Sequence, residues 1–282
     1  MIERNPWLDV LAHAVMILGA LVVAFPIYLA FVASTHATQD IMQAPMPLLP
    51  GGHFWQSYHD ALSGGGKVSG TASVPRMIWV SFVVTMIITC GKIAISLLSA
   101  FAIVYFRFPL RGLCFWLIFI TLMLPVEVRI GPTYEVIAKL HMVNNFVGLS
   151  VPLIASATAT FLFRQFFLTV PDELVEAARV DGAGPMRFFF NILLPLSATS
   201  VAALFVTQFV YGWNQYLWPL IVAGSEDMYP IVVGIKSMMG AGESQSDWNI
   251  VMATACLALL PPALVVVLMQ KWFIKGLVDT EK

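Results

Sequence analysis

Long apolar runs separated by short polar segments make up most of this sequence. A helix needs about 20 apolar residues to cross a bilayer, and six of the runs approach or exceed that length. We place them near 10–33, 77–105, 113–132, 147–166, 199–223 and 250–272. The pattern therefore predicts an all-α, polytopic membrane protein whose six transmembrane helices form one domain over residues 1–282.

Composition supports this class and excludes others. Apolar side chains make up 59% of the residues and charged ones 11%, which is outside the range of soluble globular domains. A net charge of −1 without a basic stripe gives no reason to expect a nucleic-acid partner. The cysteines lack paired spacing, so no metal site is expected. Because no small-residue cleavage site follows the first apolar run, we expect an uncleaved first span.

The basic residues divide unequally between the two sides of the predicted bundle. One side carries Arg4, Arg107, Arg111, Arg164, Arg179, Arg187, Lys271, Lys275 and Lys282, and the other carries Lys67, Arg76, Arg129, Lys139 and Lys236. Cytoplasmic segments are enriched in Lys and Arg. This asymmetry predicts that both termini, and the polar stretch 169–195, are cytoplasmic.

The stretch 169–195 is the one long polar interval in the second half of the chain, and it predicts a short helix. Thr169 and Asp172 fit a capping box, and the acids that follow suit the positive end of a helix dipole. The helix should end near Val180, with Gly182 in the left-handed conformation that closes it. Gly184-Pro185 should restart a helical turn, and Pro195 should kink the entry to the next span.

The spacing of small and apolar residues in this stretch resembles a known motif. Glu176-Ala177-Ala178, then Gly182, Ile192, Leu194 and Pro195, are similar to the EAA loop of permease subunits of ABC importers. In that family the loop forms a cytoplasmic coupling helix that contacts the ATPase subunit. The resemblance implies ATPase-coupling roles for Glu176, Ala177, Ala178, Asp181, Gly182, Ile192, Leu194 and Pro195. The alternative is an ordinary amphipathic interfacial helix, which the full spaced pattern between two spans disfavours.

Charged residues inside the spans are the candidates for a solute path. Lys92 lies near the middle of the second span, and Glu127 and Arg129 lie near the outer end of the third. Buried charges in a bilayer are costly and face partners or water. For Glu127, an ion pair with Lys92 or Arg129 and a functional role are about equally supported. For Lys92 and Arg129 we favour a positive lining for an anionic solute.

The fifth span brings further hydrogen-bonding groups to membrane depth, at Trp213, Asn214 and Gln215. We include them as candidate path residues. For Asn214 and Gln215, bonding to a partner subunit is slightly favoured over contact with the solute.

The resemblance extends to nearly the whole chain from the second span onward. The segments RFPLRG, LPVEV, FLFRQFF, GWNQYLWPL and QKWFIKGL are similar to the carbohydrate-uptake branch of these permeases. Arg129, Lys92 and the residues of the EAA region more narrowly resemble the second permease subunit of bacterial sn-glycerol-3-phosphate importers. This implies the type I ABC importer permease fold and a location in the bacterial inner membrane.

The resemblance also implies an assembly. Its other members would be a second permease subunit in a heterodimer, an ATPase dimer, and a periplasmic or extracellular solute-binding protein, for which the loop 34–75 could offer a surface. The chain has no Walker motif, so we expect ATP and magnesium on the ATPase, no cofactor on this chain, and no enzymatic activity of its own.

Two other functions fit part of the evidence. An ABC permease for a neutral sugar or oligosaccharide would share every feature except the charges. An ion-coupled secondary carrier could use Lys92 and Glu127 in a relay, but no inverted repeat is visible and the polar loop would have no purpose. A membrane-embedded enzyme is least supported, since no catalytic motif is present.

Overall fold

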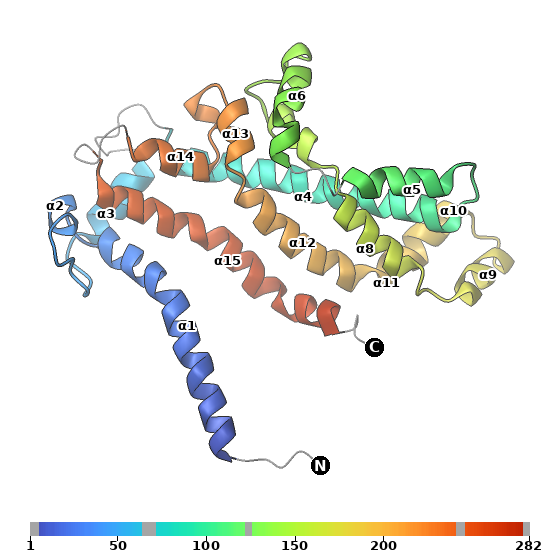
Figure 1. Cartoon of the computed structure of the whole chain (residues 1–282), viewed down its shortest axis with the longest axis horizontal. Helices are drawn as coiled ribbons and strands as arrows, with labels where there is room; N and C mark the ends of the chain where they lie inside the picture. The colour runs from blue at the N-terminus through green and yellow to red at the C-terminus, as the bar shows by residue number, and fades with distance from the viewer. Residues whose placement is uncertain (1–5, 64–71, 122–125, 241–245, 279–282) are drawn as a thin grey trace. The chain divides into compact units, whose positions relative to one another are not determined.

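The computed structural model describes residues 6–63, 72–121, 126–240 and 246–278, and these form helices, turns and loops with no strand (Figure 1). By internal contacts the chain divides into two compact units. The first comprises residues 1–76 and 234–260, and the second comprises residues 77–233 and 261–282. Each unit is described by itself below, and the prediction of a single permease domain stays a prediction.

Three helices are long and apolar enough to cross a bilayer. They are α1 (Pro6–Ser34), α4 (Val74–Tyr105) and α15 (Trp248–Val278). They confirm the first, second and sixth predicted apolar helices; α1 and α15 extend beyond the predicted bounds at both ends, and α4 does so at its start. Only 6% of the most apolar window of α1 is buried, as expected for a helix whose surroundings are lipid or a partner.

The third predicted span does not form one helix in the described residues. Helix α5 (Arg111–Ile120) is too short to span on its own, and α6 (Val126–Lys139) begins beyond residues 122–125, which lie outside the described part. Figure 1 shows the axes of α5 and α6 pointing in different directions. The predicted span over 113–132 stays a prediction, because residues 122–125 lie outside the described part of the chain.

The fourth predicted span is a bent pair of helical segments. The first segment comprises α7 (Phe146–Ser150) and η2 (Val151–Leu153), and α8 (Ala157–Phe167) follows at an angle of 48°. Ser156 causes the break, because its backbone is extended and its Oγ accepts a hydrogen bond from the backbone N–H of Ala159 (3.3 Å). A serine that caps a helix in this way ends the preceding one.

The fifth predicted span, 199–223, is divided between two helices, and as a membrane span it stays a prediction. Helix α12 (Ala198–Trp213) ends at Asn214, and α13 (Leu217–Val222) begins three residues later. Before α12, a segment of α10 (Pro185–Phe188), η3 (Phe189–Leu193) and α11 (Leu194–Leu196) bends by 71° into α12. The bend follows Pro195 by two residues, which confirms the predicted kink.

By length and composition the described helices include three spans, or five if each bent pair is one span. The fold is thus a helical membrane protein, and the six-span count is a finer statement than these helices establish.

The first unit contains the predicted loop 34–75, which is partly helical. Helices α2 (Thr38–Ile41) and α3 (Phe54–Ser63) are joined to α15 by Asn249, whose amide accepts from Thr38 Oγ1 (2.7 Å) and donates to Ser57 Oγ (3.0 Å). Tyr58 Oη lies 3.2 Å from Ser34 Oγ, and burial raises the pKa of this hydroxyl. These hydrogen bonds hold the loop against the ends of α1 and α15.

The second unit is held by two apolar clusters. One centres on Phe163, Phe167 and Leu193 and joins α4, α8 and the 185–196 segment. The other centres on Val80, Leu149 and Trp218 and joins α4, α7 and α13. At the start of α14 (Ile231–Met238), the backbone N–H of Ile231 donates to the buried Ser81 Oγ (2.7 Å). Helix α4 is thus the common support of both clusters.

Candidate functional site: the 169–195 loop and the polar side chains of α4 and α12

The polar loop contains the predicted short helix, α9 (Asp172–Val180), with a different start from the one expected. Pro171 is its N-cap, without a side-chain hydrogen bond. Thr169 Oγ1 instead donates to the carbonyl of Phe166 (2.7 Å) at the end of α8, so the predicted capping box does not form. Asp172 and Glu173 occupy the first turn, where their charges stabilise the helix dipole.

The end of α9 is closed as the sequence predicted. Gly182 has φ +70°, the left-handed conformation. The N–H of Gly182 donates to the carbonyl of Arg179 (3.0 Å), and the N–H of Ala183 donates to that of Ala178 (2.8 Å). This pair of bonds is a Schellman motif, which turns the chain sharply at a fixed residue.

Helix α9 has one face inside the subunit and one face outside. Ala178 is buried, 4% exposed, and belongs to the same cluster as Phe101 and Phe188. Glu176 and Ala177 are exposed. Of the two small residues, Ala178 therefore lets α9 approach its own chain, while Ala177 leaves the outer face free for a partner.

The remaining coupling-loop residues follow the same division. Ile192 and Leu194 are partly buried against the cluster of Phe163 and Phe167, whereas Asp181, Gly182 and Pro195 are exposed. The apolar residues of the motif thus fix the loop to the bundle.

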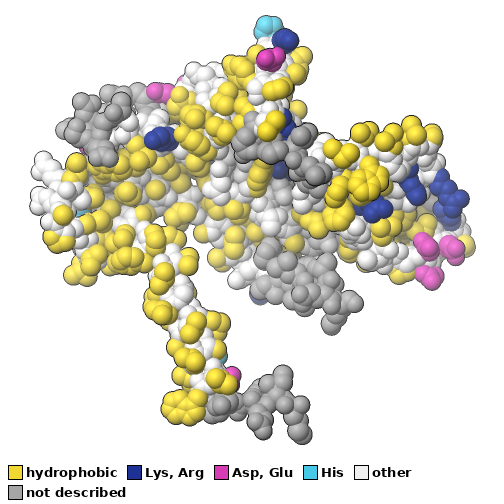
Figure 2. Space-filling model, in the orientation of Figure 1, with side chains coloured by type: hydrophobic (Ala, Val, Ile, Leu, Met, Phe, Trp, Pro, Cys, Tyr) yellow, Lys and Arg dark blue, Asp and Glu magenta, His cyan; other side chains and the backbone are white. Residues whose placement is uncertain are grey.

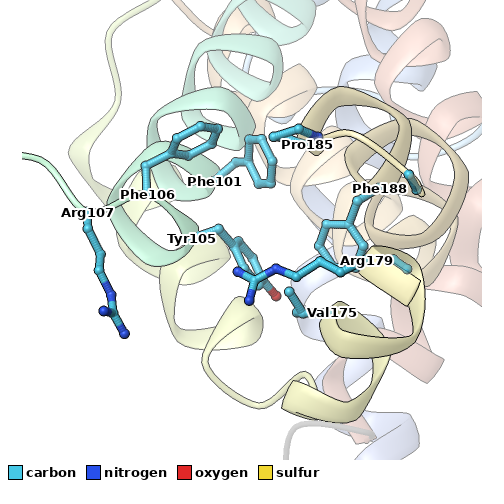
Figure 3. A pocket seen from close by; sticks show the side chains of 10 residues that line it. Phe101, Tyr105, Phe106, Arg107, Val175, Arg179, Pro185 and Phe188 are labelled. Atoms are coloured by element: carbon cyan, nitrogen blue, oxygen red, sulfur yellow. The ribbon is translucent and has the colours of Figure 1, made fainter. Parts of the chain in front are cut away.

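A cavity of about 260 Å³ lies between α9, α10 and the C-terminal end of α4 (Figure 3). Its walls include Phe101, Tyr105, Val175, Arg179, Pro185 and Phe188. The Tyr105 and Phe188 rings lie 5.4 Å apart at a steep angle, and Tyr105 Oη donates to the carbonyl of Phe167 (3.3 Å). Figure 3 shows the Arg179 side chain reaching across toward Tyr105, whereas Arg107 points away.

Figure 2 shows acidic and basic side chains gathered at the end of the second unit that carries α9. Helix α9 and the turn after it contribute Asp172, Glu173, Glu176, Arg179 and Asp181, all exposed. Most of the rest of this face is apolar (Figure 2). The charge marks a surface that lies outside the hydrocarbon.

Lys92 lies on the inner side of α4, 5% exposed. Its Nζ donates to Gln208 Oε1 (3.0 Å) and lies 3.8 Å from the ring centroid of Tyr211, both on α12. An ammonium over an aromatic face is electrostatically stabilised. The structure thus joins Lys92 to two residues that sequence reasoning did not select.

The other two charged path candidates lie on α6. Arg129 is partly buried, and its positive charge acts on Lys92. The side chain of Glu127 lies outside the described residues. The ion pair considered for Glu127 therefore stays a prediction.

The three candidates at the end of α12 take up different positions. Trp213 is 2% exposed and stacks on Phe209, with ring centroids 5.8 Å apart. Asn214 Nδ2 donates to the carbonyl of Val210 (3.0 Å), and Gln215 Nε2 donates to that of Tyr211 (3.2 Å). Asn214 is exposed and Gln215 is partly exposed, while the Trp213 ring is buried.

A periodic signal in the sequence could have found Gln208 and Tyr211. The apolar run of α12 contains polar residues at 207, 208, 211, 214 and 215, which is the spacing of one helical face. The prediction used only the last two, because the first three were taken as part of an apolar span.

Comparison with known proteins places the chain in a family. Residues 92–279 match the family described as "Binding-protein-dependent transport system inner membrane component". The chain belongs to this family. It is 58% identical over its whole length to the sn-glycerol-3-phosphate transport system permease protein UgpE of Pectobacterium atrosepticum, and 57% identical to the protein of the same name in Brucella melitensis. The Escherichia coli O1:K1 protein of that name is 58% identical, again over the full length of both chains.

A solved structure supports the fold of the family member described here. A chain from the crystal structure of a bacterial ABC transporter involved in the import of the acidic polysaccharide alginate matches with a TM-score of 0.77. The match covers 97% of this chain and 99% of that one, at 22% identity. The resemblance to ABC importer permeases is therefore confirmed, both in sequence and in fold.

Proposed function

We propose that this chain is the permease subunit that forms half of the path for sn-glycerol-3-phosphate in an ABC importer. The assignment of the solute rests on the 57–58% identity, over the full length, to proteins named as sn-glycerol-3-phosphate transport permeases. The cationic residues Lys92 and Arg129 agree with a phosphate-bearing solute.

The loop 169–195 couples transport to ATP hydrolysis. A separate ATPase subunit docks on the exposed face of α9, at Glu176 and Ala177. The buried face of α9 rests on Phe101 and Phe188, so a push on the helix displaces α4 and the 185–196 segment, which leads into α12. Small shifts of packed elements then reorient the bundle between inward-open and outward-open states.

The proposed assembly contains this chain, a second permease, two ATPase subunits and an external solute-binding protein. The chain lies in the bacterial inner membrane, with α9 and both termini in the cytoplasm. ATP and magnesium belong to the ATPase subunits, and this chain takes no part in the hydrolysis chemistry.

Competition in transport tests the solute assignment. Proteoliposomes that contain the complete importer, with the ATPase subunits facing a lumen loaded with ATP, should take up radiolabelled sn-glycerol-3-phosphate. An excess of a neutral sugar should leave that uptake unchanged. Uptake of a neutral sugar that sn-glycerol-3-phosphate does not inhibit would contradict the assignment and leave a sugar permease.

A further inference from the structure

Helix α12 carries a polar stripe, which we define as Thr207, Gln208, Tyr211, Asn214 and Gln215. All five are exposed or partly exposed in this subunit. The opposite side of α12, which includes Ala202, Val206 and Phe209, is buried against the rest of the unit. Polar groups at membrane depth do not face lipid, so the stripe faces water or a partner subunit.

Lys92 fixes the orientation of Gln208 on this stripe. An ammonium can only donate, so the atom of Gln208 that it contacts at 3.0 Å is the carbonyl oxygen Oε1. The amide –NH₂ of Gln208 must then point away from Lys92. Gln208 Nε2 makes no hydrogen bond to the residues that the structure describes, so both of its protons are available to a ligand.

Tyr211 adds a second donor one helical turn away. Its ring is held beside the Lys92 ammonium, and the residue is 38% exposed. In the described part of the chain its hydroxyl makes no hydrogen bond. The Tyr211 Oη–H is therefore free to donate.

The contacts of Lys92 within the described part of the chain include no acidic side chain, and the side chain of Glu127 lies outside that part. No carboxylate that the structure describes lies within 4.0 Å of its Nζ, whose described contacts are Gln208 and the Tyr211 ring. One turn before Lys92 on α4, the buried hydroxyl of Thr89 has no hydrogen-bond partner. Burying a cation without a counter-ion, beside hydrogen-bond donors that have no acceptor, costs free energy. Binding of an anion at this place would lower that cost.

We propose that Gln208 and Tyr211 contact the phosphate group of the solute during transport, with Lys92 behind them as a positioning residue and the source of positive charge. Phosphate oxygens accept hydrogen bonds and would take the Gln208 Nε2–H and Tyr211 Oη–H donors together. This inference rests on the proposed function, since it needs a phosphate-bearing solute. It assigns recognition to residues outside the coupling loop.

Transport kinetics of matched variants test it in the complete importer. Gln208→Leu removes the amide, and Tyr211→Phe removes only the hydroxyl while keeping the ring against Lys92. Lys92→Met removes the positioning bond, and Lys92→Arg keeps a charged donor. Thr207→Val is the control, because the Thr207 hydroxyl is already bonded to the backbone carbonyls of Ala203 and Leu204.

Loss of one hydrogen bond to a charged group weakens binding by about tenfold. We therefore expect KM for sn-glycerol-3-phosphate uptake to rise about tenfold in Gln208→Leu and Tyr211→Phe and to stay at the wild-type value in Thr207→Val. Lys92→Met should raise KM at least as much as Gln208→Leu, because it removes the positive charge as well as the positioning bond. Adding Gln208→Leu to Lys92→Met should raise KM no further, and Lys92→Arg should keep KM near the wild-type value. ATPase activity stimulated by the loaded binding protein reports that each complex is assembled.

The outcomes separate the two levels of inference. If the wild-type complex transports sn-glycerol-3-phosphate and the Gln208 and Tyr211 variants keep its KM, the recognition proposal is overturned and the proposed function stands. If the assembled wild-type complex does not transport it, the proposed function fails and the recognition proposal fails with it.

Discussion

At the residue scale, backbone conformation decides which glycines matter. Gly182 takes φ +70° but has no atom within 4 Å of the position of an added Cβ. Its role in ending α9 is therefore conformational and not steric. Gly148, in α7, is the opposite case, because a Cβ there would run into the backbone carbonyl of Met142.

The effect of a substitution at Gly182 should depend on how readily the new residue adopts the left-handed backbone conformation, and not on the size of its side chain. A side-chain-bearing residue in this conformation costs about 1–2 kcal/mol, more for a β-branched residue and less for asparagine. Gly182→Val should impair ATP-driven uptake while leaving the protein in the membrane, and Gly182→Asn should keep most of it. Equal uptake by the two variants would refute a conformational role.

Gly148→Ala should destabilise the protein by about 1–3 kcal/mol, because the chain around α7 must move. Gly148 also accepts a hydrogen bond from Trp218 Nε1 (3.1 Å) and donates to Asn145 Oδ1 (2.8 Å), so the movement disturbs both bonds. Thermal unfolding in detergent measures the loss. Gly184→Ala is the matched control, since nothing lies within 4 Å of its added Cβ, and a similar drop in both variants would contradict the packing argument.

The residues that could be predicted are those whose role is local. The left-handed Gly182, the end of α9 at Val180 and Pro185 at a helix start follow from turn and cap chemistry in neighbouring residues. The spacing of polar residues in α12 indicates the face that carries Gln208 and Tyr211, but the sequence does not show that they contact Lys92, which is 116 residues from Gln208.

At the element scale, α9 presents two faces with different tasks. Ala178 packs inside the subunit, and Ala177 next to it is exposed. The sequence predicts the helix but not which side of it faces the interior, because two adjacent alanines are equally suited to either side. The cluster on Phe101 and Phe188 determines which alanine is inside.

The two alanines give a matched pair of variants. Ala178→Leu overpacks the buried face, which typically costs about 1–3 kcal/mol, and should lower the unfolding temperature of the purified permease. Ala177→Leu should leave that temperature unchanged and reduce binding-protein-stimulated ATPase activity, because the outer face no longer fits its partner. Normal stimulation in a stable Ala177→Leu complex would contradict docking on this face.

Breaks within the predicted spans have local causes that hydropathy averages out. Ser156 caps α8, and Asn214 ends α12, yet both lie in strongly apolar surroundings. A window of about 20 residues records the apolar majority and passes over one capping side chain. The long helices α1, α4 and α15 were predictable because no capping side chain interrupts them.

At the scale of the whole molecule, the charge asymmetry gives a topology that can be tested by labelling. In a variant with Cys90, Cys114 and Cys256 replaced, Glu173→Cys on α9 should react with a membrane-impermeant thiol reagent only after the cells are opened. Gln56→Cys, exposed on α3, should react in cells whose outer membrane alone is permeabilised. Reaction of Glu173→Cys in such cells would reverse the topology and remove α9 from the reach of an ATPase.

The fold class and family were predictable from the whole chain because hydropathy and the spaced loop pattern are spread over many residues. The solute was predictable only through resemblance to relatives, since a path built by two subunits leaves half of its walls in another sequence.

The most direct test of the central claim is the energy requirement for uptake. Proteoliposomes containing this chain, its second permease, the ATPase and the binding protein should accumulate radiolabelled sn-glycerol-3-phosphate with ATP and not with a non-hydrolysable analogue. Ala177→Leu should abolish the accumulation. Accumulation by this chain alone, or without ATP hydrolysis, would contradict an ATP-coupled permease driven through α9.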